Sequence, residues 1–109
     1  MAEVFLSTNA LFSEWCSPRN PSLLKLGDRV GIRGRRWRLV LREAQVCYLE
    51  ENERVFHWGE WWMICHRYGL VWLVRVGETR APLGGMYGRP VWIDSETKVQ
   101  ELVLQRIGE

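Results

Sequence analysis

Short stretches in which apolar and polar residues alternate recur along this chain about every ten residues, and glycine-containing turns separate them. Val30 and Ile32 alternate with polar or small residues before a turn predicted at Gly34-Arg35, and Trp37 and Leu39 alternate in the same way after it. A period of two is typical of strands that bury one face, and short strands joined by tight turns form antiparallel sheets. The pattern predicts a mainly β fold, either a small, strongly bent antiparallel sheet or a partly open SH3-like barrel.

The pattern continues into the second half of the chain. Further strands are predicted over residues 46–49, 54–58, 60–66, 70–76 and 91–93. Between them, the carboxylates of Glu50–Glu53 predict an exposed loop tip, because carboxylates are not buried without partners. Gly59 is interpreted as a bulge and Tyr68-Gly69 as a turn. In the strand over residues 70–76, alternation predicts four inward side chains: Leu70, Trp72, Val74 and Val76.

The N-terminal segment departs from this pattern. Residues 1–22 are predicted to form an appendage packed on the core, with a short helix that carries Leu11, Phe12 and Trp15 on one side. Residues 23–109 are predicted to form a single β-rich domain, since a chain of 109 residues leaves no room for two separate cores.

The C-terminal segment supports two interpretations. Val99, Leu102, Val103 and Ile107 would share one face of a helix, whereas Val103, Gln105 and Ile107 also alternate as they would in a strand. We prefer the helix, so the fold is expected to carry short helices at both its N- and C-terminal ends.

Four stretches within residues 24–76 resemble a known family. They are Leu26-Gly27-Asp28-Arg29-Val30, Gly34-Arg35-Arg36-Trp37, Trp58-Gly59-Glu60-Trp61-Trp62-Met63 and Leu70-Val71-Trp72-Leu73-Val74. Their order and spacing resemble the bacterial family catalogued as domain of unknown function 4178. The resemblance implies a β-rich fold and a small accessory role in bacterial or phage genomes. It implies no enzymatic activity and no catalytic residues.

Arginines dominate the basic residues of the predicted hairpin at residues 29–42. Five of them are expected to project together: Arg29, Arg33, Arg36, Arg38 and Arg42. Such a stripe suits nucleic-acid phosphates or an acidic protein surface. Because the formal net charge is only +2, an alternative is that these arginines pair with carboxylates on the solvated face, notably Glu43, Glu60 and Glu78.

Seven tryptophans predict either an aromatic core or an exposed aromatic surface. Trp61 and Trp62 are consecutive on one strand, so they project from opposite faces, and at least one of them should be partly exposed. Trp58 and Tyr68 would join such a surface, and Glu60 is expected to meet an arginine on the neighbouring strand. The alternative is that a terminal segment covers the second face.

The loop at residues 83–90 offers Met86, Tyr87 and Arg89, three residue types that are favoured in protein interfaces. It lacks the Lys-Ser/Thr of a phosphate-binding loop, so no nucleotide site is predicted. The same segment is equally consistent with a simple connector.

The sequence gives little support for a metal site, a reactive thiol or acid–base catalysis. Cys47, His57, Cys65 and His66 lack metal-ligand spacing, and Cys65 and His66 point to opposite sides of a strand. We therefore expect no metal, no cofactor and no enzymatic activity. Three cysteines without paired spacing indicate free thiols in the cytoplasm. Neither a membrane span nor a secretory signal is expected.

Together these observations predict a non-enzymatic binding module whose partner is another protein. The predicted contact residues are Trp61, Trp62, Tyr68, Met86, Tyr87 and Arg89. The alternatives are nucleic-acid binding through the stripe at residues 29–42 and a self-associating structural subunit.

Overall fold

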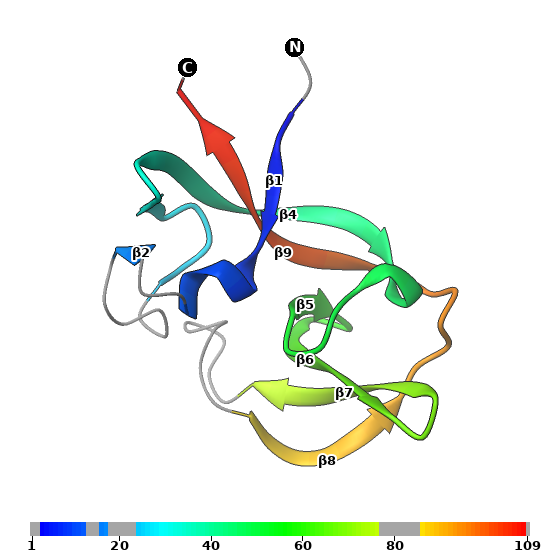
Figure 1. Ribbon diagram of the computed structural model, residues 1–109. Helices are drawn as coiled ribbons and strands as arrows, with labels where there is room; N and C mark the ends of the chain where they lie inside the picture. Colours follow the sequence, from blue (N-terminus) through cyan, green and yellow to red (C-terminus); the bar gives the residue numbers. More distant parts are fainter. Residues whose placement is uncertain (1–2, 13–15, 18–23, 77–85, 109) are drawn as a thin grey trace.

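The computed structural model describes residues 3–12, 16–17, 24–76 and 86–108, which form one antiparallel sheet of nine strands (Figure 1). The strands are β1 (Phe5–Ser7), β2 (Cys16–Ser17), β3 (Arg29–Ile32), β4 (Arg35–Gln45), β5 (Arg54–His57), β6 (Glu60–Arg67), β7 (Leu70–Val76), β8 (Met86–Trp92) and β9 (Lys98–Ile107). Their order across the sheet is β2-β3-β4-β9-β5-β6-β7-β8, with β1 also paired to β9. The mainly β prediction is confirmed, and the sheet is bent but not closed into a barrel.

The prediction of a C-terminal helix is wrong, because that segment forms β9 at the centre of the sheet. β9 pairs with β4 along its whole length, and its other edge takes β5 near Gln100 and β1 near Leu104. The backbone N–H and C=O groups of three strands therefore find partners on β9, which a helix would have left unpaired. Leu102 and Val103 are both buried, on opposite faces, so the segment needs the alternation of a strand.

Regular helix in the described part of the chain is limited to two short 3-10 helices, η1 (Thr8–Phe12) and η3 (Val46–Tyr48). The N-terminal helix predicted around Leu11 is thus a single 3-10 turn that follows β1, and the strand predicted at residues 46–49 is instead η3 with an extended residue after it. None of the described helices is long and apolar enough to cross a membrane.

Three two-residue turns close the hairpins. Arg33-Gly34, Trp58-Gly59 and Tyr68-Gly69 each have positive φ at both residues, between 52° and 78°. Positive φ at both central positions is the signature of type I′ turns, whose twist matches that of the flanking strands. The turn predicted at Gly34-Arg35 is thus displaced by one residue, Gly59 belongs to a turn and not to a bulge, and Tyr68-Gly69 is confirmed.

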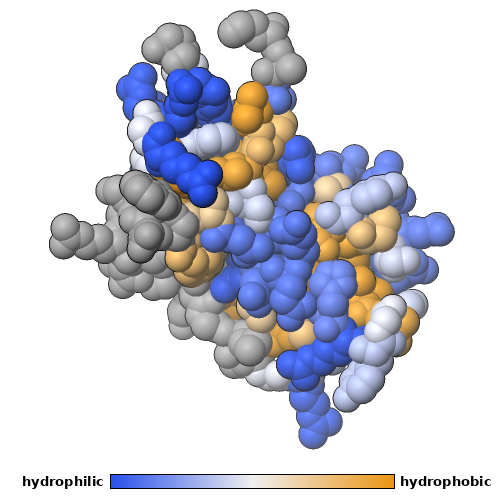
Figure 2. Space-filling view, in the orientation of Figure 1, coloured by the Kyte–Doolittle hydropathy of each residue, from blue (hydrophilic) through white to orange (hydrophobic). Residues whose placement is uncertain are grey.

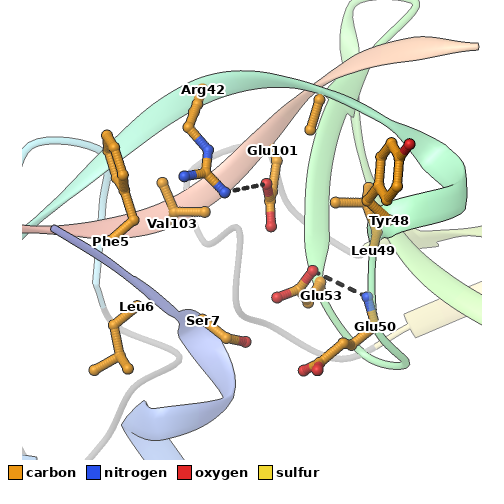
Figure 3. Close-up of a pocket in the computed structure, with 11 residues that line it drawn as sticks. Phe5, Leu6, Ser7, Arg42, Tyr48, Leu49, Glu50, Glu53, Glu101 and Val103 are labelled. Atoms are coloured by element: carbon orange, nitrogen blue, oxygen red, sulfur yellow. Dashed lines mark hydrogen bonds and ion pairs between the residues drawn. The ribbon is translucent and has the colours of Figure 1, made fainter. Parts of the chain in front are cut away.

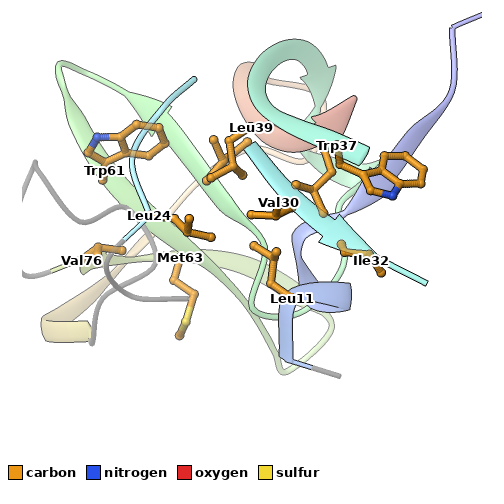
Figure 4. Packing of buried hydrophobic residues seen from close by; sticks show 11 residues of the cluster. Leu11, Leu24, Val30, Ile32, Trp37, Leu39, Trp61, Met63 and Val76 are labelled. Atoms are coloured by element: carbon orange, nitrogen blue, oxygen red, sulfur yellow. The ribbon is translucent and has the colours of Figure 1, made fainter. Parts of the chain in front are cut away.

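Around β6 the sheet is buried on both faces, and a separate hydrophobic cluster lies on each. Trp61 and Met63 belong to the first cluster, drawn in Figure 4, which fills the inside of the bend. Trp62 and Ile64 belong to the second cluster, which Val46 and neighbouring residues cover. The prediction that Trp61 or Trp62 is partly exposed is therefore wrong, since alternation sends each indole into a different cluster.

β7 is likewise buried on both sides over part of its length. Val74 and Val76 point into the core as predicted, but Val71 and Leu73 on the opposite face are also buried. Leu70 is exposed, so only the second half of the predicted inward series enters the core. Leu70 and Trp72, at the start of β7, therefore lie at the surface and not in the core.

Candidate functional site

An exposed aromatic surface lies where β7 begins and β8 ends. We define this aromatic surface as Tyr68, Leu70, Trp72 and Trp92. Trp72 and Trp92 are direct cross-strand partners, and Leu70 lies two residues from Trp72 on the same face. Trp92 is 52% exposed and Leu70 is also exposed, while Trp72 is half-buried and donates from its Nε1 to the carbonyl of Arg67 over 3.2 Å. Two indoles and a leucine thus form a continuous apolar area.

Tyr68 stands at the tip of the same hairpin and is 92% exposed. Its φ of 58° is a conformation that a bulky side chain rarely adopts, and left-handed backbone costs about 1 kcal/mol or more for a residue other than glycine. The side chain buries almost nothing to offset that cost. Figure 2 shows pale and apolar atoms side by side over this end of the molecule, at the lower right.

Positive charge borders the aromatic surface. Arg67 is the cross-strand partner of Leu70, and Arg89 lies on β8; both are exposed. β8 is the last strand of the sheet among the described residues, so this area lies at an edge that a partner can approach.

The predicted protein-binding residues fall into three groups. Trp61 and Trp62 are core residues, 7% and 2% exposed. Tyr68 and Arg89 are exposed, as the prediction requires. Met86 and Tyr87 lie on β8, but their side chains lie outside the described part of the structure.

Sequence reasoning missed Trp92 and placed Trp72 in the core. Alternation places Trp92 and Ile93 on opposite faces, but the sequence does not show which of the two faces is covered at this point.

Trp58 occupies the turn at the opposite end of β6 and is also largely exposed, at 59%. Unlike Tyr68 it has intramolecular contacts, since its ring meets the Trp62 ring edge-on at 5.8 Å. Trp62 in turn donates from its Nε1 to the carbonyl of His57 over 2.7 Å. Glu60 forms an ion pair with Arg75 on the neighbouring strand at 3.1 Å, which confirms the predicted pairing of Glu60 with an arginine.

Four arginines of the predicted stripe share the sheet face that carries the second cluster. Arg36, Arg38 and Arg42 alternate along β4, and Arg29 is the direct cross-strand partner of Arg38. Arg33 lies in the turn and lines a cavity on the other face.

The alternative that carboxylates neutralise this stripe holds only for Arg42, which pairs with Glu101 at 3.3 Å and lies 4.4 Å over the Phe5 ring. Within the described residues, Arg29, Arg36 and Arg38 have no ion pair. Of the predicted acidic partners, Glu60 pairs with Arg75, Glu43 forms no ion pair within the described residues, and Glu78 lies outside them.

A polar pocket of about 270 Å³ opens beside Arg42, between β1 and η3 (Figure 3). Two carboxyl groups, those of Glu53 and Glu101, lie in its wall, and both residues are almost fully buried. Glu53 accepts the backbone N–H of Glu50 over 3.1 Å, and its carboxyl lies close enough to that of Glu101 to affect the pKa of Glu101. The expectation that Glu50–Glu53 is a wholly exposed loop tip is therefore wrong for Glu53, which has the partners that a buried carboxylate needs.

Burial raises the pKa of Glu101 from 4.5 to about 7, and the hydrogen bond and negative charge of Glu53 add to the rise. Arg42 opposes it by favouring the ionised form, but its side chain is partly exposed and its effect is the smaller one. The Glu101 carboxyl therefore keeps its proton to a higher pH than an ordinary glutamate does. A carboxyl whose pKa is raised by folding makes the stability of the protein depend on pH.

The cysteines and histidines do not converge. Cys47 is exposed, Cys65 is buried, and both are free thiols. His66 contacts the Leu49 carbonyl through Nε2 at 2.9 Å, and burial lowers the pKa of His57. Within the described residues, no group of three or more potential ligands is placed to hold a metal ion.

Comparison with known proteins adds no relative. No protein-family model, curated protein or solved structure matches this chain. The resemblance to domain of unknown function 4178 thus stays a prediction.

Proposed function

We propose that this protein is a non-enzymatic binding module that engages another protein through the aromatic surface. The observation that carries the proposal is the cross-strand pair of Trp72 and Trp92, which stays partly exposed beside exposed Leu70. Tryptophan and tyrosine dominate the binding energy of protein interfaces, because each buries a large area while few side-chain torsions are fixed. A domain with two buried clusters available for its indoles has no packing reason to leave Trp92 outside.

The chemistry around the surface specifies the partner. Arg67 borders it as the cross-strand partner of Leu70, and exposed Arg89 lies on the same strand as Trp92, so the matching surface of the partner carries carboxylates around an apolar centre. Tyr68 supports the same conclusion, since its strained backbone positions an aromatic side chain in solvent. In line with the free thiols and the family resemblance, we place this role in the cytoplasm, as a small bacterial or phage accessory factor.

The test compares two exposed tryptophans that lie near opposite ends of the β6–β7 hairpin. Trp92 pairs with Trp72 near the start of β7, and Trp58 lies in the turn before β6. Immobilised wild type, Trp92→Ala and Trp58→Ala are incubated with host lysate, and retained proteins are identified by mass spectrometry. We expect a defined protein that resists nuclease and high salt, that Trp92→Ala loses, and that Trp58→Ala keeps. Equal retention by wild type and Trp92→Ala, with both folded, would exclude the aromatic surface as the binding site.

Nucleic-acid binding is a second candidate, favoured by one specific observation. Arg29 and Arg38 are direct cross-strand partners with no ion pair within the described residues, and like charges in that position repel unless an anion lies between them. Arg36 lies on the same face, and the predicted stripe adds Arg33 and Arg42. Backbone phosphates would neutralise the positive charge of this face, and such binding would not require contacts with base edges in a groove.

This alternative has its own experimental signature. If phosphates bind here, Arg36→Glu combined with Arg38→Glu should abolish binding to a nucleic-acid duplex, and wild-type affinity should fall steeply with salt. Weak, salt-independent binding that the double variant retains would eliminate it. A self-associating subunit, the third candidate, would instead show a mass that rises with protein concentration in sedimentation.

A further inference from the structure

A second, apolar cavity lies on the inner face of the sheet, at the turn end of the β3–β4 hairpin. Its volume is about 360 Å³, and its described lining residues are Leu6, Ala10, Ile32, Arg33, Arg35 and Trp37. Cavities that bind small molecules measure roughly 300 to 1,000 Å³ and combine apolar walls with a few polar groups. This cavity lies well away from the aromatic surface and plays no part in the proposed protein contact.

Trp37 brings a buried hydrogen-bond donor without an acceptor to this cavity. The residue is 7% exposed, and its Nε1–H has no partner within the described part of the chain. Trp62 and Trp72, in contrast, each donate to a backbone carbonyl. Figure 4 shows the nitrogen-bearing edge of Trp37 turned toward Ile32 and β1, the elements that also line the cavity. A buried donor left unpaired costs about 1 to 3 kcal/mol, so a ligand that supplies an acceptor would gain binding free energy.

Two arginines supply positive charge at the same cavity. Arg35 lies on the same face of β4 as Trp37, and Arg33 reaches the cavity from the turn. Both are exposed, and neither has an ion pair within the described residues. Figure 2 shows strongly hydrophilic atoms gathered over this end of the hairpin, at the upper left. The cavity thus offers apolar walls, one neutral donor and two guanidinium groups.

We propose that this cavity binds a small carboxylic acid with an apolar body. The body packs against Leu6, Ala10 and Ile32, and the carboxylate accepts the Trp37 Nε1–H and faces the two arginines. Guanidinium groups match the planar carboxylate with two parallel hydrogen bonds. An inorganic anion would leave the apolar walls empty, a cationic amphiphile has no acceptor for the indole N–H, and a neutral one brings no negative charge to the arginines.

Octanoate is a suitable probe, and the indole N–H signals of the full chain in ¹H–¹⁵N NMR spectra provide the readout. Trp37→Phe assigns the Trp37 signal, which we expect octanoate to shift downfield, saturably and before the other indole signals. Octylammonium, which keeps the alkyl chain but has no acceptor for the indole N–H, should not produce this shift, and octanol, which has an acceptor but no charge for the arginines, should produce it only at much higher concentration. A shift of all indoles together, or an equal shift with octylammonium, would show detergent-like association and overturn the proposal.

Variants test the three polar groups separately. Trp37→Phe removes the N–H together with part of the ring, and the lost hydrogen bond to a charged group alone should weaken octanoate binding about tenfold. Arg35→Gln and Arg33→Gln should each weaken it severalfold. Arg36→Gln, on the opposite face of β4, is the matched control and should bind as wild type does. If the Arg33 and Arg35 variants, which change exposed side chains, bind octanoate like wild type, the cavity does not select a carboxylate.

Discussion

Replacement of Glu101 by glutamine is predicted to stabilise the protein at neutral and alkaline pH. In the wild type burial raises the pKa of Glu101 to about 7, and the neighbouring carboxyl of Glu53 adds to the rise. Above that pH the Glu101 carboxylate carries its charge in a largely buried wall of the pocket, beside Glu53. Glutamine has the same shape, keeps an oxygen for Arg42 and donates an N–H to Glu53 at every pH, so Glu101→Gln removes the repulsion without emptying the site.

The direction follows from the bound proton. The pKa of Glu101 is raised by folding, so the folded protein holds a proton that the unfolded chain releases near its ordinary value of 4.5. The resulting stabilisation is complete below that value and is lost as the pH rises through about 7. Each pH unit between 4.5 and about 7 corresponds to about 1.4 kcal/mol of unfolding free energy. The wild type should therefore lose roughly 3 kcal/mol of stability over this interval, and Glu101→Gln should not.

Urea unfolding between about pH 5 and pH 8 measures this difference. His57 contributes with the opposite sign, because burial lowers its pKa and stability from that group is lost as the pH falls below 6.5. The wild-type curve therefore sums both effects, and the difference from Glu101→Gln isolates the carboxyl pair. Glu43→Gln, a change at an exposed carboxyl on β4, should follow the wild type. If the unfolding free energy of Glu101→Gln also changes with pH as that of the wild type does, the account of a raised Glu101 pKa is wrong.

Two further predictions concern aromatic side chains. Trp62→Ala should lower the unfolding free energy by roughly 3 to 5 kcal/mol because it empties the second cluster, whereas Trp58→Ala should cost much less; similar losses in urea unfolding would contradict the two-cluster core. Tyr68→Asn should raise the unfolding free energy by roughly 0.5 to 1 kcal/mol, since asparagine tolerates the positive φ of the type I′ turn; lower stability in thermal unfolding would show that Tyr68 has a structural role.

The hairpin strands at residues 29–42 and 54–76 were predictable because their signals are local, although of the turns only Tyr68-Gly69 was placed correctly. Alternation through Val30 and Trp37 and the glycines of the three turns fix hairpins within about ten residues of sequence. What local patterns do not contain is which hairpin lies next to which. β9 shows the consequence: its apolar residues fit a helix and a strand equally well, and only the free edges of β4, β5 and β1 decide in favour of the strand.

The errors at the candidate site have the same origin. Alternation correctly sent Trp61 and Trp62 to opposite faces, but the sequence does not reveal that the bent sheet buries both faces at this point. It likewise could not pair Glu53 with Glu101, which lie far apart in the chain and meet only because β5 pairs with β9. Buried carboxyls and exposed tryptophans both depend on contacts between distant segments.

The most direct test of the proposed function places a photo-crosslinking residue on the surface itself. The chain is expressed in its host with p-benzoylphenylalanine at position 92 or, as the control, at position 58, and is then irradiated. We expect position 92 to form a covalent adduct with one discrete protein and position 58 to form none with it. If position 92 yields no adduct while position 58 does, the aromatic surface is not where this protein meets its partner.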